Sequence, residues 1–194
     1  MMNPDDEDIQ LMLRFKNGEE SCFKKLVERH KERIFNLVYR FLGSYSQAQD
    51  LAQEVFIKIY HAKDAYTPQA KFTTWLYTIC KNTCLNVLRE NNPVHFSIDD
   101  SLELEENKLA PQFADTHTPS PSDLVLQQEQ SLVVKNAIDS LPSSQKMVVL
   151  LNRYDQLSYE EISQVMNCSV ESVKSLLHRA RLNLKERLKN YINN

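Results

Sequence analysis

The sequence predicts an all-α protein, with two small helical domains joined by a flexible acidic linker, and three observations carry that prediction. Gly occurs only twice in 194 residues, whereas β-hairpins depend on turns rich in glycine. Apolar residues recur at intervals of three and four over long stretches, as on helices with one buried face. Four of the seven prolines fall between residues 93 and 121, where this periodicity stops.

The first domain is predicted at residues 1–90, as a bundle of four helices around one core. The first helix is expected at about 6–16, the second ends at Gly43, the third includes Ile59, and the fourth covers about 73–90. Gly43 suits the left-handed residue that follows many helices. The apolar stripes expected to form the core are Phe23, Leu26, Val27, His30, Ile34, Leu37, Val38 and Phe41 on the second helix, Leu51, Ala52, Val55, Phe56 and Ile59 on the third, and Trp75, Ile79, Thr83 and Val87 on the fourth.

Residues 91–122 are predicted to be the linker. The stretch is rich in Pro, Ser, Thr, Asp and Glu, so it cannot bury enough apolar surface to offset the entropy of ordering. Between residues 91 and 126 there are seven acids against a single base, Lys108. We therefore expect two separately folded modules that are loosely tethered.

The second domain, predicted at residues 123–194, contains the sharpest local signal in the chain. Its helices are expected at about 123–139, 143–154, 158–166 and 170–190. Ser158-Tyr159-Glu160-Glu161 has the form of a capping box, and Leu157 and Ile162 occupy the positions of a hydrophobic staple. Asn167-Cys168-Ser169 then provides a short turn whose serine can cap the last helix. Two helices joined by such a turn, the second of them basic, describe a helix-turn-helix.

The last helix is predicted to read duplex DNA. Between Lys174 and Lys189 there are six Lys or Arg residues against one acid, Glu186. The second helix of such a motif enters the major groove, where Lys and Arg can reach guanine edges or phosphates and Glu can accept from cytosine. A merely solvated helix face would carry similar charges, but cap, staple, turn and charge agree on DNA binding. The residues predicted to contact the duplex are Glu171, Ser172, Lys174, Ser175, His178, Arg179 and Arg181.

Two blocks of sequence resemble a known family. Tyr154 to Ile162, followed by Val173-Lys174-Ser175 and His178-Arg179-Ala180-Arg181, is similar to region 4 of bacterial sigma factors. Asp50 to Lys58 and Phe72 to Ile79 are similar to region 2. Both regions in this order, in so short a chain, resemble the extracytoplasmic-function (ECF) sigma factors of the sigma-70 family. The chain departs from the family pattern where Glu171-Ser172 replaces a frequent Gly-Thr and Ser163 replaces an alanine, and the first change concerns the bases that are read.

The resemblance implies partners and two further sets of contacts. A sigma factor directs core RNA polymerase, through its β and β′ subunits, to promoters, where region 4 binds the duplex −35 element and region 2 melts and binds the −10 element as a single strand. A loop from Tyr66 to Phe72 is the candidate pocket for an unstacked base, whereas the stripe position of Trp75 assigns it to the core. The residues expected at the −10 strand are Lys71, Phe72, Thr78, Lys81, Asn82, Asn86 and Arg89. Those expected to bind polymerase are Asp50, Gln53, Glu54, Ile57 and Lys58.

No motif in the sequence indicates an enzyme or a cofactor. A Gly-rich phosphate loop, a metal-ligand cluster and a nucleophile motif are all missing from it. Cys80 and Cys84 lie one helical turn apart and are interpreted as small core residues. Because no apolar run is long enough to span a membrane and the acidic N-terminus is unlike a secretion signal, we expect a cytoplasmic protein without membrane insertion. The resemblance further implies an anti-sigma factor as a partner.

Two other functions would also use a basic helix-turn-helix. A conventional transcriptional regulator would bind duplex DNA tightly without polymerase, with its N-terminal domain sensing an effector. An adaptor would use the basic helix to bind protein, and it would show no salt-dependent affinity for DNA. The matched N-terminal block favours the sigma factor over both alternatives.

Overall fold

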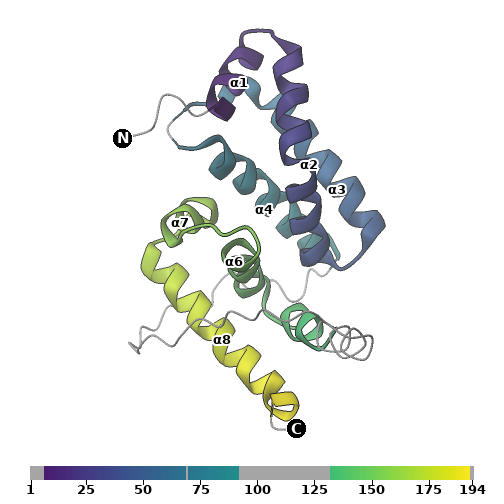
Figure 1. Ribbon diagram of the computed structural model, residues 1–194, viewed down its shortest axis with the longest axis vertical. Helices are drawn as coiled ribbons and strands as arrows, with labels where there is room; N and C mark the ends of the chain where they lie inside the picture. The colour runs from purple at the N-terminus through teal and green to yellow at the C-terminus, as the bar shows by residue number, and fades with distance from the viewer. Residues whose placement is uncertain (1–6, 69, 92–131, 193–194) are drawn as a thin grey trace, which may run out of the picture.

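The computed structural model describes residues 7–68, 70–91 and 132–192, and these residues contain helices without strands (Figure 1). The elements are α1 (Glu7–Lys16), α2 (Glu20–Leu42), α3 (Tyr45–His61), the 3-10 turn η1 (Lys63–Ala65), α4 (Phe72–Asn91), a helical segment at 132–139, α6 (Ser143–Arg153), α7 (Tyr159–Met166) and α8 (Val170–Ile192). The all-α prediction is confirmed, and the helices whose two ends are described lie within a few residues of their expected places; the start of the helix predicted at about 123–139 lies outside the described residues. The predicted linker at 91–122 lies almost wholly outside the described residues.

The N-terminal half is built on the hairpin of α2 and α3, with α1 and α4 packed against it (Figure 1). The stripe predicted for α3 is buried, as is that for α2 except for the half-buried Phe23 and Val27, and Leu26, Ile34 and Val55 are almost fully removed from solvent. Each such side chain contributes about 1.5–3 kcal/mol when buried. Gly43 ends α2 with φ 78°, and its N–H donates to the carbonyl of Tyr39. The predicted left-handed residue after α2 is therefore confirmed.

The helix α4 differs from its prediction because it is buried on two sides. Its main buried side carries Phe72, Leu76 and Cys80, each 1% exposed or less, whereas Trp75, Ile79 and Val87 of the predicted stripe are only half-buried. A second buried row, Thr74, Tyr77, Lys81 and Cys84, faces elsewhere. The prediction of one apolar stripe is wrong for α4, because two different parts of the molecule pack against this helix.

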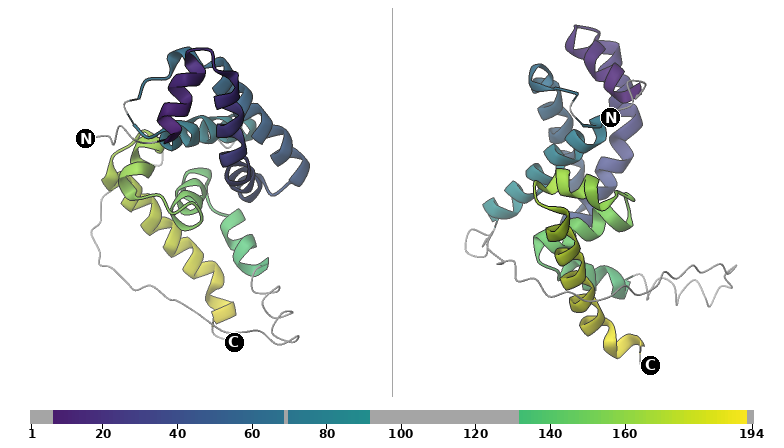
Figure 2. Two further views of the ribbon diagram at one scale, coloured as in Figure 1. Left: turned by 45° about the horizontal axis from the view of Figure 1, so that its top comes forward. Right: turned by 90° about the vertical axis from the view of Figure 1, so that its left-hand side faces the viewer.

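The C-terminal half packs α6, α7 and α8 around a small core (Figure 2). Ser158 begins α7 with both bonds of the capping box: its hydroxyl accepts from the N–H of Glu161 at 3.2 Å, and the Glu161 carboxylate accepts from the N–H of Ser158 at 2.9 Å. Ile162 is fully buried and Leu157 is 9% exposed, as the staple requires. The predicted cap and staple are confirmed.

The two halves are in contact, which corrects the expectation of two loosely tethered modules. Helix α7 packs against α4, and α6 packs against α2, so that the apolar side chains of both halves form one connected cluster. The views in Figures 1 and 2 agree in placing α7 beside α4. The linker composition gave no sign of this contact, because packing between distant segments leaves no local periodicity.

Candidate nucleic-acid interface

The helix-turn-helix is held by contacts local to its own sequence. Asn167 ends α7 in the left-handed conformation with φ 55°, and its N–H donates to the carbonyls of Gln164 and Ser163. Ser169 caps α8, because its hydroxyl accepts from the N–H of Ser172 at 3.1 Å. These caps set where α7 ends and where α8 begins. The N-terminal turn of α8, which such motifs present to DNA, is thereby defined.

The burial of one side of α8 leaves its opposite side open. Val173, Leu177 and Ala180 are all buried and fix the rotation of the helix about its axis. Of the seven residues predicted to contact the duplex, four are exposed and three are half-buried; the exposed ones are Glu171, Lys174, His178 and Arg181, and the half-buried ones are Ser172, Ser175 and Arg179. Their spacing of three and four residues places them along one side of the helix. The structure therefore brings this predicted set together on an accessible surface.

On α4 the predicted set is divided. Asn82, Asn86 and Arg89 are exposed and lie along one side of the helix. Thr78 is half-buried, and its hydroxyl donates to the carbonyl of Thr74 at 2.8 Å. Lys71 is at the N-terminal end of α4, and its Nζ lies 2.7 Å from a carboxylate oxygen of Glu161 in the other half of the chain.

Phe72 and Lys81 are not accessible in this structure, which corrects their assignment to the DNA surface. The ring of Phe72 lies 5.6 Å from that of His30, 6.2 Å from that of Tyr66 and 6.2 Å from that of Trp75. Because these side chains fill the space, the expected pocket between Tyr66 and Phe72 is occupied by the protein itself. Trp75 is half-buried in the same aromatic cluster, in keeping with its assignment to the core.

Lys81 is covered by the C-terminal half rather than by its own bundle. Only 8% of the residue is exposed, and Cys168, in the turn between α7 and α8, is one of its electrostatic neighbours. Burial lowers the pKa of Lys81, and the charge of Arg89 lowers it further against an opposing influence of Cys168. A helical projection places Lys81 beside Asn82, but it cannot show which residues another half of the chain will cover.

Sequence reasoning missed a pair of residues between the halves. Tyr77 on α4 is 3% exposed, and its hydroxyl donates to the Asp155 carboxylate at 2.9 Å. Burial raises the pKa of Tyr77, and the neighbouring Asp155 raises it further. Burial likewise raises the pKa of Asp155, although the bond from Tyr77 and the charges of Arg33 and Arg40 oppose this. The sequence feature that could have indicated this pair is the row from Thr74 to Lys81, which gives α4 a second buried side.

The helix α3 presents the predicted polymerase set on its outer side. Asp50, Gln53, Glu54 and Ile57 are exposed, and Ile57 is the most apolar of them at 55% exposure. Lys58 is half-buried, forms an ion pair with Glu54 at 2.7 Å and donates to Thr83 at 3.2 Å. The structure brings these five residues onto one face.

A groove of about 530 Å³ lies between α2 and α3, along the edge of that face. Val27, Ala52 and Phe56 form part of its lining, and Gln53 belongs both to the groove and to the predicted polymerase set. Its mouth carries Phe35 and Tyr45, and these rings contact each other and that of Tyr39, which lies outside the lining; sequence reasoning missed this aromatic group. Tyr45 is 65% exposed. The surface therefore extends from α3 across to α2.

Comparison with known proteins matches both halves of the chain to one family. The family model for sigma-70 region 2 matches residues 26–93, and the one for sigma-70 region 4 matches residues 131–184. The ECF RNA polymerase sigma factor SigW of Bacillus subtilis is 32% identical over 174 residues, which cover 90% of this chain and 92% of the relative. The ECF RNA polymerase sigma-E factor of Escherichia coli is 35% identical over 175 residues, covering 90% of each chain.

The chain belongs to the ECF sigma factors. This membership favours the sigma-factor interpretation over a conventional helix-turn-helix regulator. Region 2 accordingly comprises most of α2 together with α3 and α4, and region 4 comprises the segment at 132–139 with α6, α7 and most of α8.

Solved structures of related proteins share the fold. The structure of CnrH in complex with the cytosolic domain of CnrY matches 95% of this chain and 99% of that chain, with a TM-score of 0.69 and 22% identity. The sigma factor RpoE of Bartonella quintana, solved with the anti-sigma factor NepR, matches 86% of this chain and 96% of its own, with a TM-score of 0.61 and 22% identity. In the part of this chain that the structure describes, no helix is long and apolar enough to cross a bilayer.

Proposed function

We propose that this sigma factor directs core RNA polymerase to promoters by binding two forms of the same DNA. Region 4 binds the −35 element as a duplex through α8, and region 2 binds the melted −10 element through α4. The observation that carries the proposal is the accessible basic side of α8, fixed by three buried residues, in a chain that also contains region 2.

The exposed side of α8 has the chemistry for duplex recognition. Lys174 and Arg181 can reach phosphates or the acceptor atoms of guanine, and Glu171 can accept from the amino group of cytosine. Because α8 is capped at Ser169, its first turn is available to enter the major groove. Ser172 next to Glu171 provides a hydroxyl that can donate or accept at a neighbouring base or phosphate.

The exposed side of α4 suits an opened strand. The amides of Asn82 and Asn86 can both donate and accept at base edges, and Arg89 can neutralise a phosphate. A protein that binds flipped bases favours the melted state in proportion to its preference for it. Melting is then a conformational exchange that requires no covalent step.

The outer side of α3 and the neighbouring groove are the proposed polymerase surface. An exposed Ile57 among Asp50, Gln53 and Glu54 combines an apolar centre with a polar rim, as interfaces do. Tyr45 at the mouth of the groove adds an exposed aromatic ring of the kind enriched in interfaces. The β′ subunit is the partner proposed for this surface, and the β subunit for region 4. The protein then acts in the cytoplasm, with an anti-sigma factor as a further proposed partner.

Run-off transcription with purified core polymerase tests the proposal. A promoter is first selected from templates with randomised −35 and −10 elements, and specific transcripts are expected only when core enzyme and this protein are both present. Tight binding to duplex DNA without polymerase, and no effect on transcription, would instead identify a conventional regulator. No salt-dependent affinity for DNA in either state would identify an adaptor.

A pair of matched variants localises the duplex contact. Lys174→Ala should reduce promoter-dependent transcription by about tenfold, since one good contact to DNA contributes about 1–3 kcal/mol. Lys185→Ala removes the same charge from an exposed position on the same helix, outside the predicted set, and should leave transcription close to the wild-type level. Equal effects of the two changes would show that only the total charge of α8 matters.

A further inference from the structure

We infer that α1 braces the connection between η1 and α4, and that Lys16 at the end of α1 is a positioning residue for the strand that region 2 binds. We call this connection the entry loop; its described residues are 66–68, 70 and 71. The inference rests on the proposed binding of the opened −10 strand by region 2, and it adds residues that this proposal does not use.

The entry loop extends the proposed strand surface of α4. Thr67 and Lys71 are exposed. From Lys71, steps of four, three and four residues along the helix reach Asn82, so Lys71 lies at the beginning of the side of α4 that carries Asn82. A strand that crosses this side therefore meets the loop. The place of the loop then determines which bases or phosphates Thr67 and Lys71 can reach.

Lys16 holds the start of the entry loop by its backbone. Its Nζ donates to the carbonyl of Asp64 at 2.8 Å and to that of Tyr66 at 3.0 Å. Asp64 lies in η1, and Tyr66 is the first residue of the loop. Hydrogen bonds from an ammonium are shorter and stronger than those between neutral groups. One side chain of α1 therefore fixes two peptide groups where the chain leaves η1.

An aromatic contact holds η1 to the same end of α1. The ammonium of Lys63 lies 4.9 Å from the ring centre of Phe15 and 5.4 Å from that of Tyr60. Phe15, the residue before Lys16, is fully buried, and its ring stacks on that of Phe23 at 4.7 Å. Because the ring of Phe15 is fixed in the core, the cation that lies over it holds η1 in place.

The other end of α1 acts, through His30, on the residue with which α4 begins. The carboxylate of Asp8 bonds the guanidinium of Arg29 and lies 2.8 Å from Nε2 of His30. The ring of His30 is buried and lies 5.6 Å from that of Phe72, the first residue of α4. Burial opposes the charge on Asp8, but the bonds with His30 and Arg29 outweigh it and lower the pKa of Asp8. Helix α1 thus supports both ends of the entry loop, which leaves fewer conformations to the residues between them.

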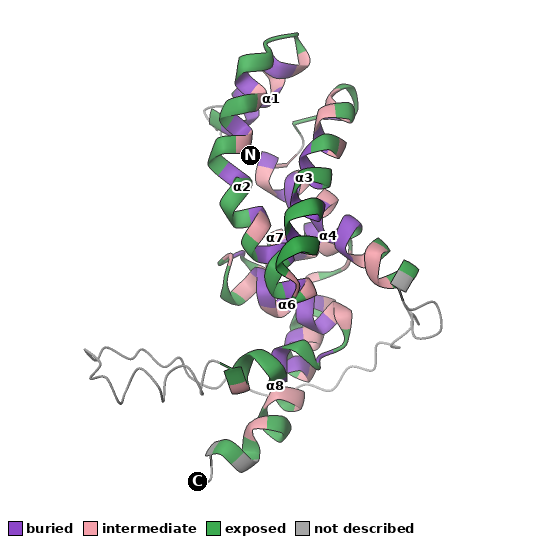
Figure 3. Cartoon of the chain, turned by 90° about the vertical axis from the view of Figure 1, so that its right-hand side faces the viewer, coloured by how far each residue is buried: buried purple, intermediate pink, exposed green. Residues whose placement is uncertain are grey.

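Helix α1 lies outside region 2 as the family match defines it, because that match begins at residue 26. The helix is nevertheless part of the N-terminal core, since Leu11, Met12 and Phe15 are almost fully buried. Figure 3 shows buried and exposed positions alternating along α1. A helix that the match to region 2 does not contain therefore supports the loop that precedes α4.

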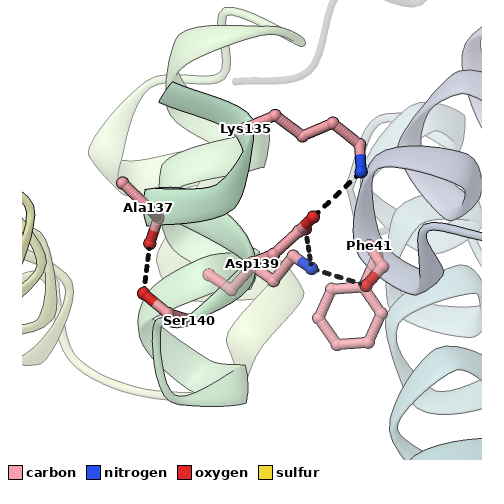
Figure 4. Close-up of polar contacts among 6 residues, drawn as sticks. Phe41, Lys135, Ala137, Asp139 and Ser140 are labelled. Carbon is pink, nitrogen blue, oxygen red and sulfur yellow. Dashed lines mark hydrogen bonds and ion pairs between the residues drawn. The ribbon is translucent and has the colours of Figure 1, made fainter. Parts of the chain in front are cut away.

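The same kind of contact occurs at the end of another helix. Lys146 is 7% exposed, and its Nζ donates to the carbonyl of Phe41 at 2.8 Å and to Asp139 at 2.7 Å. Figure 4 shows Asp139 between Lys135 and the end of α2 at Phe41. The last carbonyls of a helix lack partners within the helix and carry partial negative charge, so a cation there is favourable. Lys146 also neutralises a carboxylate, whereas Lys16 donates to two carbonyls, so replacement of Lys16 acts first on the backbone of the loop.

Hydrogen exchange in three full-length variants tests the brace. Lys16→Met keeps the aliphatic part of the side chain and removes the ammonium, Lys16→Arg retains donors, and Lys24→Met removes the same charge from an exposed position on α2. The reporter is the N–H of Tyr66, which donates to the carbonyl of Lys63 at 3.2 Å and whose exchange is followed by NMR. We expect exchange about tenfold faster in Lys16→Met, because two charge-assisted bonds that hold this turn are lost, and within about twofold of wild type in the other two variants.

Strand binding by the holoenzyme tests whether the brace matters for recognition. A fluorescent single strand carrying the selected −10 sequence should bind about tenfold more weakly to polymerase with Lys16→Met than with wild type, and within about twofold of wild type with Lys16→Arg or Lys24→Met. Selection from randomised −10 strands should return a relaxed base preference with Lys16→Met, while the preference at −35 is unchanged. A general loss of folding would weaken recognition of both elements, so the comparison separates positioning from stability.

A further variant, Lys63→Met, keeps the test decisive if Lys16→Met folds poorly. It removes only the cation over Phe15 and Tyr60, and it should speed exchange of the Tyr66 N–H and weaken strand binding by about threefold each. Equal exchange in wild type and both variants would overturn the brace. Faster exchange with undiminished strand binding would overturn the positioning role of Lys16, and so would weaker binding without faster exchange.

The two measurements also distinguish this inference from the function on which it rests. If exchange is faster in Lys16→Met but polymerase with the wild-type chain binds no −10 strand, the brace stands and the proposed function of region 2 fails. If the wild-type holoenzyme binds the strand and the holoenzyme with Lys16→Met binds it equally well, the proposed function stands and the positioning role of Lys16 is wrong.

Discussion

The two helices proposed to bind DNA, α8 and α4, differ in what determines their accessible sides. Helix α8 is buried on one side by its own half of the chain, and its other side is exposed. Helix α4 is buried on one side by region 2 and on another by region 4. The accessibility of a DNA-binding surface that faces a second domain changes when that domain docks on it. One that is defined by a local motif remains available whenever the motif is folded.

This difference leads first to a prediction about folding, where the largest effect is expected. Leu177→Ala should lower the free energy of unfolding of region 4 by about 2–5 kcal/mol, because Leu177 is 4% exposed and its loss leaves a cavity under α8. Leu182→Ala on the same helix should cost less than about 0.5 kcal/mol, since Leu182 is 53% exposed. Urea denaturation followed by circular dichroism measures both. A similar cost for both variants would contradict the one-sided burial of α8.

The next effect concerns the contact between the halves. Lys146→Met should destabilise the docked arrangement by about 1–3 kcal/mol, because it leaves the Phe41 carbonyl and Asp139 without a buried cation. Lys135 bonds the same Asp139 from an exposed position, so Lys135→Met should cost less than about 1 kcal/mol. Thermal unfolding that separates into two transitions in Lys146→Met alone would confirm that the halves normally unfold together. Identical melting of both variants would count against a stabilising contact between Lys146 and the carbonyl of Phe41.

The same difference between α8 and α4 explains which features of the structure could be predicted from the sequence. The stripe of α3, most of that of α2, the capping box at Ser158 and the accessible set on α8 were predicted correctly, because each depends on residues close together in sequence. The burial of Lys81 and Phe72 and the pairing of Tyr77 with Asp155 were not, because they depend on residues far away in the chain. The spacing of apolar residues within α4 does not distinguish a side of the helix that faces solvent from one that faces another domain.

The groove between α2 and α3 was missed for a related reason. Phe35 lies beside the core stripe of α2 and Tyr45 is the first residue of α3, and nothing local in the sequence indicates that the two rings meet. Their contact depends on the angle between two helices, which the short connection at Gly43 sets together with the core. The residues predicted on α3 are exposed together, but whether they bind polymerase stays a prediction.

A smaller effect tests whether the helix-turn-helix is defined locally. Ser158→Ala should lower the stability of region 4 by about 1 kcal/mol, because the first turn of α7 loses the side-chain acceptor for the N–H of Glu161. Ser163→Ala, within the same helix, removes only a bond to a carbonyl of the preceding turn and should be neutral or slightly stabilising. Urea denaturation again provides the measurement. Equal loss from both changes would mean that the cap is not what begins α7.

The smallest expected effect is a dependence of docking on pH, with two contributions of opposite sign. Burial raises the pKa of Asp155 above its value of 3.8 in water, so the docked chain binds a proton there more readily, and this contribution favours docking as the pH falls. Lys71 lowers the pKa of Glu161 below 4.5, so that contribution to docking is present above 4.5 and is lost as the pH falls. In the wild-type chain the two partly cancel.

Removing one contribution reveals the other. In Glu161→Gln the radius of gyration, measured by small-angle scattering, should fall slightly as the pH is lowered toward 3.8, because the raised pKa of Asp155 makes the docked chain take up a proton above that value. The double variant with Asp155→Asn lacks that titration and should not contract. Arg33 and Arg40 face Asp155 but keep their charge over this range, and Tyr77 stays protonated, so none of them imitates the effect. Asp139 also titrates in acid, but it does so equally in both variants. Expansion rather than contraction of Glu161→Gln would show that the Asp155 carboxylate is docked in its charged form, held by the two arginines more strongly than burial opposes it.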